Sequence, residues 1–324
     1  MTQHRSGRPF TDRRDHYQEV TDRIVAALEA GTRPWRQPWI DGAPGMPVNG
    51  ATGRRYHGIN TVILATTAFA LDGDPRFCSY KQAADRGWQV RKGERGTTVF
   101  FFRKLPVVDR DAAPDSEDRT RAIPMLRSYS VFNGSQIDGI PAYVAPDLTQ
   151  APWRRPEATQ TILANSGARL RIGGEEAFYS PTIDFVQMPP EAYFPDASNW
   201  SAVLLHELSH WSGAAHRLNR DLSVRYGSVK YAQEELRAEL ASVLIGAEMG
   251  LPCDIPNHAS YIKAWTEVLK RDKREIFRAA SDAQRIADYL LGFHPDYALA
   301  AANAGDSFED DATASTQPGA AQAA

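Results

Sequence analysis

The sequence of 324 residues is poor in the features that mark exported or membrane proteins. It has only two cysteines, Cys78 and Cys253, and they lie far apart, so neither a disulfide framework nor a cysteine-rich metal site is indicated. It has no apolar run long enough to span a membrane. Its first residues lack the apolar core of a secretory signal. We therefore expect a cytoplasmic protein with no membrane partner.

The net charge of −3 is small, but the charges are unevenly distributed along the chain. Residues 1–104 carry 17 Lys and Arg against 10 Asp and Glu, whereas the remaining residues carry 20 against 30. A basic first part beside an acidic remainder is typical of a protein whose first part contacts a polyanion.

The order of helix, strand and linker signals predicts an α+β fold in two domains, and the length is enough for a core in each. We expect a flexible N-terminus at 1–14, a first domain at 15–145, a linker at 146–157, a second domain at 158–300 and a disordered tail at 301–324. Helices are expected at 15–30, 60–71, 80–85, 157–166 and 229–249, with two more across 258–291. Strands are expected at 97–102, 127–132, 168–172, 176–180 and 183–188, and a mobile charged insert at 109–121.

The second domain contains an HExxH motif, from His206 to His210. On a helix, residues four apart lie one turn apart on the same face, so both imidazoles can bind one zinc ion. Glu207 borders that face and can act as the general base toward zinc-bound water. The flanking sequence is so apolar that this helix must be buried, and buried His and Glu side chains require a ligand. The motif therefore predicts a zinc metallopeptidase site with one Zn²⁺ per chain.

A third protein ligand is needed, and the residues leave two candidates open. His216 completes the spacing HExxHxxGxxH together with Gly213, which is typical of metzincins. Glu235 lies on the apolar face of the helix predicted at 229–249, one turn before Glu239. This pair suits a gluzincin, in which Glu235 binds zinc and Glu239 holds a ligand histidine, and we favour it because no Met-turn follows His216. The same helical projection turns three charged residues toward solvent: Glu234, Arg237 and Glu248.

In the first domain, aromatic side chains alternate with cations. Single-stranded nucleic acid is bound in this way, because bases stack on aromatic rings while Lys and Arg follow the phosphates. The alternative is that the rings belong to the core and the cations solvate a surface. The candidate DNA-binding residues are Trp35, Arg36, Trp39, Arg54, Arg55, Tyr56, Tyr80, Lys81, Trp88, Arg91 and Lys92.

Several longer motifs are more specific than HExxH alone. They are GTRPW at 31–35, NGATGRRYHGIN at 49–60, YKQ at 80–82, VRKGERG at 90–96, VFN at 131–133, LHELSHWSG at 205–213 and YAQEELRAEL at 231–240. Together they resemble the ArdC-type antirestriction proteins of conjugative plasmids, whose N-terminal domain is shared with some TraC-type primases. The resemblance implies a single-stranded-DNA-binding domain followed by a zincin-like metallopeptidase domain. It also implies protection of incoming plasmid DNA from host restriction, with passage into the recipient cell during conjugation.

Three functions are consistent with these residues. The protein is a DNA-binding protection factor with a metallopeptidase-like domain, an active peptidase that cleaves host restriction or other DNA-associated proteins, or a single-strand-binding protein with a purely structural zinc site. The presence of Glu207 favours a catalytic site over a structural one, because a structural zinc needs no general base and has four protein ligands. The first two functions stay open.

Overall fold

The structure is a computed structural model of the whole chain. It describes residues 15–31, 35, 46–65, 67, 73–108, 120–144, 156–222, 225, 227–251 and 259–298. Several predictions lie outside these residues: the N-terminus at 1–14, the tail at 301–324, most of the insert at 109–121 and of the linker at 146–157, and the DNA-binding candidates Arg36 and Trp39.

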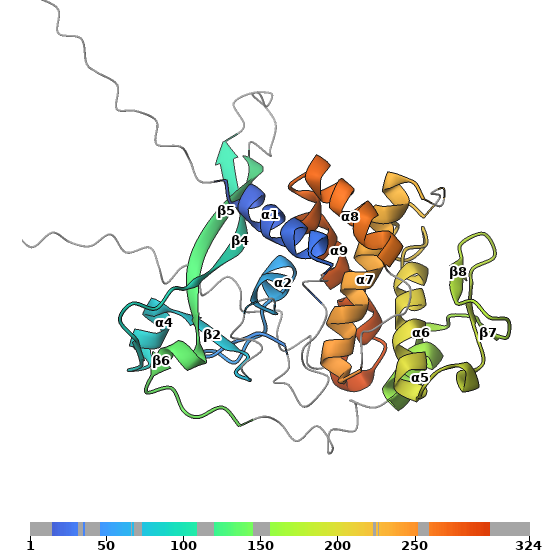
Figure 1. The fold of residues 1–324 in the computed structure, drawn as a ribbon, viewed down its shortest axis with the longest axis horizontal. Coiled ribbons are helices and arrows are strands. Elements are labelled where there is room, and N and C mark those ends of the chain that lie inside the picture. The colour runs from blue at the N-terminus through green and yellow to red at the C-terminus, as the bar shows by residue number, and fades with distance from the viewer. Residues whose placement is uncertain are drawn as a thin grey trace, which may run out of the picture.

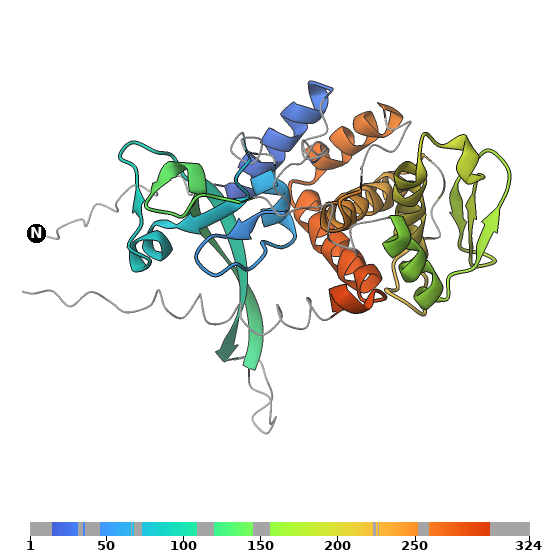
Figure 2. The ribbon, with the colours of Figure 1, turned by 90° about the horizontal axis from the view of Figure 1, so that it is seen from below.

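The first half of the chain forms a four-stranded sheet. Its strands lie in the order β1 (Val48–Asn49), β2 (Arg76–Ser79), β5 (Thr120–Asn133) and β4 (Thr97–Val108). β1 and β2 are parallel, and the other neighbours are antiparallel. The long β4–β5 hairpin projects from the body of the molecule (Figure 2). The strands predicted at 97–102 and 127–132 are confirmed, but each is longer than predicted because the two pair along their whole length.

A smaller unit lies beside this sheet. It contains α4 (Tyr80–Asp85), β3 (Gln89–Val90), the short helix η2 (Gly134–Gln136) and β6 (Ile137–Asp138), and β3 pairs with β6. α4 begins where predicted because Ser79 and Gln82 form a capping box. This unit has a small apolar cluster of its own around Cys78, Ala83 and Val90.

Two helices connect the sheet to the second half. α1 (His16–Glu29) begins at Asp15, whose carboxylate accepts a hydrogen bond from the Gln18 N–H, and ends before Gly31 at φ 75°, as predicted. α2 (Ile59–Ala65) confirms the first part of the helix predicted at 60–71, and residues 66 and 68–71 of that prediction lie outside the described residues.

The second half is a bundle of helices with a small sheet at its far end (Figure 1). The helices are α5 (Pro156–Ser166), α6 (Ala197–Trp211), α7 (Val229–Met249), α8 (Ala259–Arg271) and α9 (Glu275–Leu291), with a short η3 (Glu191–Tyr193). The sheet has the order β7 (Leu170–Ile172), β9 (Phe185–Met188), β8 (Phe178–Ser180). All these predicted helices and strands are confirmed. Among the described helices, none has the length and apolar character that crossing a bilayer requires.

One apolar core runs through both halves. It contains Ile24 and Leu28 of α1 and Phe100 of β4 together with residues of α6, α7, α8 and α9. α1 lies against α8, and the Thr21 hydroxyl donates to the Lys273 carbonyl at 2.8 Å. The α+β fold with two domains is therefore built around a core that both share.

Candidate metal centre

The two histidines of the motif lie on α6, as predicted. The helix starts at Asp196, whose side chain accepts from the Asn199 N–H at 2.8 Å, and its apolar residues are buried. His206 and His210 lie one turn apart, with ring centroids separated by 4.9 Å. The His206 side chain is buried and that of His210 is nearly so.

Glu235 of α7 meets both histidines. Its carboxylate oxygens lie 3.7 Å from His206 Nε2 and 3.6 Å from His210 Nε2. One ligand atom from each of the three residues falls within 4.8 Å of the others, and no other group of this kind is found among the described residues. Two imidazoles and a carboxylate in this arrangement match a catalytic metal site with three protein ligands.

His216 lies outside this cluster. Its side chain is 66% exposed, and its Nε2 lies 3.8 Å from Asp184 and 2.6 Å from Arg217. The structure therefore groups Glu235, and not His216, with the two histidines. Glu239 is buried at 1% exposure on the inner side of α7, and its assignment as the partner of a ligand histidine stays a prediction.

Glu207 is buried beside the two histidines. Burial raises the pKa of its carboxyl group, His206 and His210 oppose that rise, and Glu235 adds to it. A backbone hydrogen bond from Tyr179 of β8 also lowers the pKa. A carboxylate whose pKa is raised by burial is suited to accept a proton near neutral pH.

Glu234 contacts the second ring nitrogen of His210, although the helical projection predicted that it faces solvent. Glu234 Oε1 lies 3.3 Å from His210 Nδ1 and accepts from Arg220 Nη2 at 2.8 Å. Arg220 also donates to the Ser209 carbonyl at 2.6 Å. Gly213 makes room for this arginine, because a Cβ there would lie 2.8 Å from Arg220 Nη2. Gly213 of the spacing HExxHxxGxxH therefore leaves room for Arg220, which binds Glu234 beside the metal cluster.

The predictions for Arg237 and Glu248 were also wrong. Arg237 donates to Glu275 at 2.8 Å and to Asp282 at 2.7 Å, and Glu248 forms an ion pair with Arg55. The reason is that α6, α8 and α9 all pack on α7. Projecting one helix assumes a solvent side, and most of α7 is buried.

The charges of the cluster suit a divalent metal ion. Three buried carboxyl groups, Glu207, Glu234 and Glu235, lie beside two imidazoles, and the Arg220 guanidinium pairs with Glu234. Burial opposes the ionisation of Glu235, but His210 and then His206 lower its pKa to about 2. Here the charged imidazoles compensate the buried carboxylate, and a metal ion held by neutral imidazoles would do the same.

Tyr231 was not found from the sequence. It lies one turn before Glu235 on α7, and a hydrogen bond between the two side chains helps to keep the Glu235 pKa low. The Tyr231 hydroxyl also lies 3.0 Å from the hydroxyl of Tyr261 on α8. The four-residue spacing to Glu235 is the one signal that could have pointed to it.

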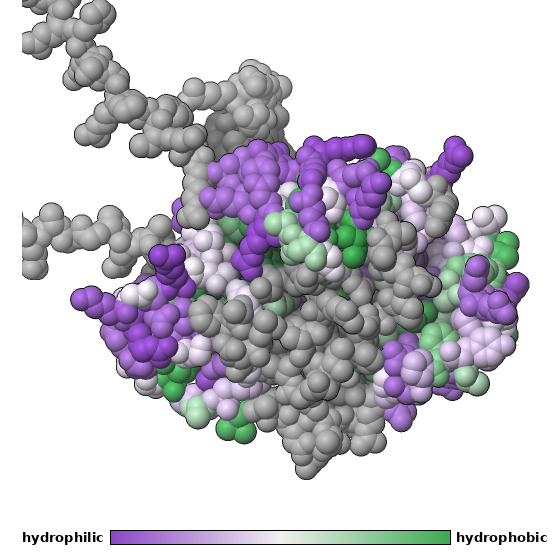
Figure 3. Space-filling view, in the orientation of Figure 1, coloured by the Kyte–Doolittle hydropathy of each residue, from purple (hydrophilic) through white to green (hydrophobic). Residues whose placement is uncertain are grey.

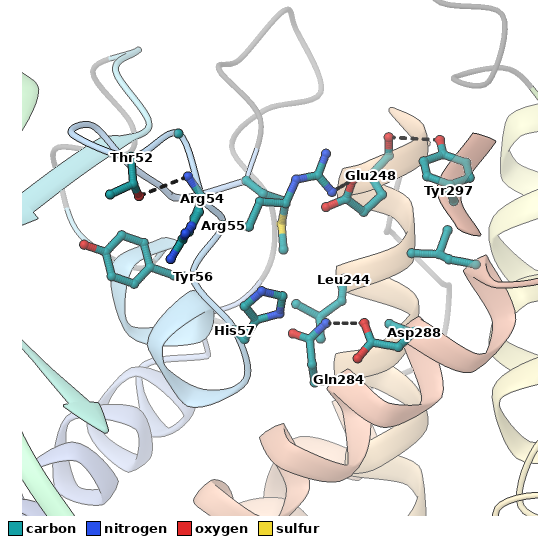
Figure 4. Close-up of a pocket in the computed structure, with 14 residues that line it drawn as sticks. Thr52, Arg54, Arg55, Tyr56, His57, Leu244, Glu248, Gln284, Asp288 and Tyr297 are labelled. Atoms are coloured by element: carbon teal, nitrogen blue, oxygen red, sulfur yellow. Dashed lines mark hydrogen bonds and ion pairs between the residues drawn. The ribbon is translucent and has the colours of Figure 1, made fainter. Parts of the chain in front are cut away.

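The DNA-binding candidates separate into three groups. Trp35 is 2% exposed against Trp265, and Tyr56 is buried with its hydroxyl donating to the Phe77 carbonyl, so neither ring can stack on a base in this conformation. We correct both to core residues. Arg54 and Arg55 line a cavity (Figure 4). The remaining described candidates lie on or near α4 and β3: Tyr80, Lys81, Trp88, Arg91 and Lys92.

This second surface is exposed and hydrophilic. Tyr80 is 54% exposed, Lys81, Arg91 and Lys92 are exposed, and Trp88 is half-buried against the small cluster. Figure 3 shows hydrophilic residues gathered over the end of the molecule that carries α4. The structure therefore brings these five residues together and leaves Trp35 and Tyr56 inside.

Two family models match the chain. Residues 14–132 match the N-terminal domain of the anti-restriction factor ArdC, and residues 157–282 match a zincin-like metallopeptidase. The crystal structure of the antirestriction protein ArdC from plasmid R388, in its metal-free form, is 41% identical with a TM-score of 0.73, covering 87% of this chain and 99% of that one. Its Mn(II)-bound form is 40% identical with a TM-score of 0.72.

Curated relatives are similar over the same span. A DNA primase TraC of Escherichia coli is 41% identical over 292 residues, which are 86% of this chain but 27% of the primase. A second Escherichia coli TraC is matched over 20% of its length, so this chain spans about a quarter or less of either primase. The uncharacterized protein y4eC of Sinorhizobium fredii is 45% identical, covering 85% of this chain and 91% of that protein.

Proposed function

The chain belongs to the family of ArdC-type antirestriction proteins, and from this premise we propose that it binds single-stranded DNA and hydrolyses peptide bonds at a zinc site, protecting incoming plasmid DNA. One observation carries the peptidase part of the proposal. Glu207 is buried next to His206, His210 and Glu235, the arrangement of a base beside a three-ligand metal site.

His206, His210 and Glu235 would hold a zinc ion, which would supply a Lewis acid for a peptide carbonyl and a water molecule. Glu207 accepts the proton of the attacking water and passes it to the leaving amine. Glu234 and Arg220 fix the orientation of the His210 ring by occupying its Nδ1 side.

β8 offers a place for the peptide. Among the described strands it pairs with β9 alone, and it lies against α6 close to Glu207, which its Tyr179 contacts. An exposed strand edge can bind an extended peptide through backbone hydrogen bonds. The proposed substrates are therefore extended segments of host restriction or other DNA-associated proteins.

Comparing the wild type with Glu207→Gln tests the peptidase part. The full chain, loaded with zinc, is incubated with unstructured peptides, with and without a single strand of DNA. We expect hydrolysis by the wild type and a loss of at least about 100-fold in the variant, with unchanged zinc content, because the amide cannot accept the proton. Equal hydrolysis by both proteins would contradict this role of Glu207.

The DNA part is tested with the full chain and a labelled single strand. The α4 surface, with Tyr80, Lys81 and Lys92, supports this part of the proposal. We expect tighter binding to single strands than to duplex, an affinity that falls with salt, and a loss of about 1–3 kcal/mol in Tyr80→Ala. Tyr193→Ala is the matched control, since this exposed tyrosine lies in η3. Failure to bind DNA at low salt would refute this part.

A further inference from the structure

A cavity lies between the two halves of the chain, and none of the metal-cluster residues lines it. Its volume is about 410 Å³, within the range of about 300–1,000 Å³ that is usual for small-molecule sites. One wall is the loop at residues 52–57, and the opposite wall is formed by α7, α9 and Tyr297 (Figure 4).

The loop wall is cationic. Its cations are Arg54 and Arg55 of the NGATGRRYHGIN motif. His57 of the same motif also lines the wall, but burial lowers the pKa of its imidazole and favours the neutral form. Arg55 forms an ion pair with Glu248, but its side chain is 43% exposed whereas that of Glu248 is 7% exposed. A guanidinium has five N–H donors, so Arg55 can keep Glu248 on one edge and bind a phosphate with another.

The helix wall combines an apolar floor with a fixed acceptor. Leu244, Ala287 and Leu291 supply the apolar surface. Asp288 accepts from the Gln284 side-chain amide at 2.8 Å, and Gln284 in turn accepts from the Gly58 N–H at 3.0 Å. These bonds orient the Asp288 carboxylate, which has further lone pairs to offer a ligand.

The positions of these charges determine the orientation in which a nucleotide can bind in the cavity. Asp288 and Glu248 on the helix wall repel a phosphate, so the phosphate belongs at the Arg54 and Arg55 side. A flat base fits the apolar floor, and a carboxylate at its edge complements an exocyclic amino group, as carboxylates do with the amino group of cytosine. Thymine has no such amino group.

We propose that this cavity receives one unstacked base of a bound single strand, that it prefers a base with an exocyclic amino group over thymine, and that Arg54 and Arg55 hold the adjoining phosphates. The inference rests on the proposed single-strand binding and adds to it a site for a single base. It gives the arginine-rich motif of the first half a role that depends on helices of the second half.

The test compares two short single strands on the full chain, one of thymine only and one with a single central cytosine. We expect the cytosine strand to bind about tenfold more tightly. Asp288→Ala, a change at an exposed helix position, removes that preference. Glu267→Ala keeps it, because Glu267 is an exposed acid on α8 outside the cavity and its loss changes the net charge equally.

A second variant fills the cavity. Leu291→Trp, at a partly exposed position, should weaken binding of the cytosine strand several-fold while the melting temperature stays near that of the wild type. If the wild type binds both strands equally, or if Asp288→Ala keeps the preference, the cavity holds no base although single-strand binding stands. If neither strand binds at all, single-strand binding itself fails and the inference fails with it.

Discussion

His210 contacts carboxylates through both of its ring nitrogens, Nδ1 toward Glu234 and Nε2 toward Glu235. Burial opposes the ionisation of Glu234, but His210 and Arg220 lower its pKa, so it stays ionised. An ionised acceptor at Nδ1 holds the proton there and leaves the Nε2 lone pair for a metal. Arg220 therefore bears on the proposed metal site through Glu234, although it is not one of the proposed ligands.

The choice of third ligand can be measured directly. We expect Glu235→Ala to reduce zinc affinity more than Glu234→Ala, which removes only an outer partner and should lower it by about 10- to 100-fold. His216→Ala should leave zinc affinity near that of the wild type, because this side chain is exposed and outside the cluster. Competition with a chelator measures all three. A large loss in His216→Ala with little in Glu235→Ala would indicate a metzincin-type site instead.

Spacing along one helix made part of this site predictable. His206, Glu207 and His210 follow from four-residue periodicity, and Glu235 follows from the apolar face of its own helix. The contact between Glu234 and His210 depends on how α6 packs on α7, and the position of Arg220 depends on the path of the chain after α6. No periodicity within one segment contains that information.

At the scale of elements, the N-terminus of α6 is capped by the side chain of Asp196. Asp196 accepts the Asn199 N–H at 2.8 Å, and this backbone hydrogen bond lowers the pKa of Asp196. The terminal N–H groups of a helix otherwise have no partner within the helix. Because the metal ligands lie on the same helix, the cap also stabilises the element that carries them.

Replacing this cap should change stability in a pH-dependent way. Asp196→Ala should lower the free energy of unfolding by about 1 kcal/mol at neutral pH, whereas Asp196→Asn should change it little. The pKa of Asp196 is lower in the folded state than its unfolded value of 3.8. The ionised cap therefore adds its full stabilising free energy above pH 3.8, and this free energy is lost as the pH falls through the folded-state pKa. Urea unfolding at several pH values measures this. Equal stability of Asp196→Ala and the wild type at neutral pH would contradict the role of the cap.

Local signals located most elements but not their extent. α4 and α7 begin at the predicted residues, and the structure shows Ser79 and Ser228 as their caps. β4 and β5 extend beyond their predicted bounds because each supplies the hydrogen-bond partner of the other, which is a property of the pair. The bounds of α7 were predicted correctly, but the solvent side assigned to it was wrong for a similar reason, since three helices pack around it.

At the scale of the whole molecule, the core of the first half is incomplete without the second. The rings of Trp35 and Trp265 lie 5.7 Å apart, and those of Tyr17 and Phe277 lie 4.7 Å apart. The domain boundaries expected from the sequence thus separate residues that share one core. A fragment ending near residue 145 would expose the apolar face of α1 to water.

This shared core predicts cooperative unfolding. Trp35→Ala should lower the free energy of unfolding by about 3–5 kcal/mol, because it leaves a cavity between the halves. Trp88→Ala should lower the free energy of unfolding by less, because Trp88 is half-buried against a separate small cluster. Guanidinium denaturation followed by circular dichroism and by tryptophan fluorescence should give one coincident transition. Two well-separated transitions would show that the halves fold independently.

The packing of α1 against α8 also affects how genes that encode this fold can be rearranged by recombination. A recombination event that carried the first half to a new gene would deliver an N-terminal helix whose covering surface is encoded far downstream, beyond residue 258. We expect such a hybrid to be less stable, because the apolar face of its first helix would lack the surface that covers it. The matches to the two longer TraC primases each cover 86% of this chain, so the similarity extends over both halves.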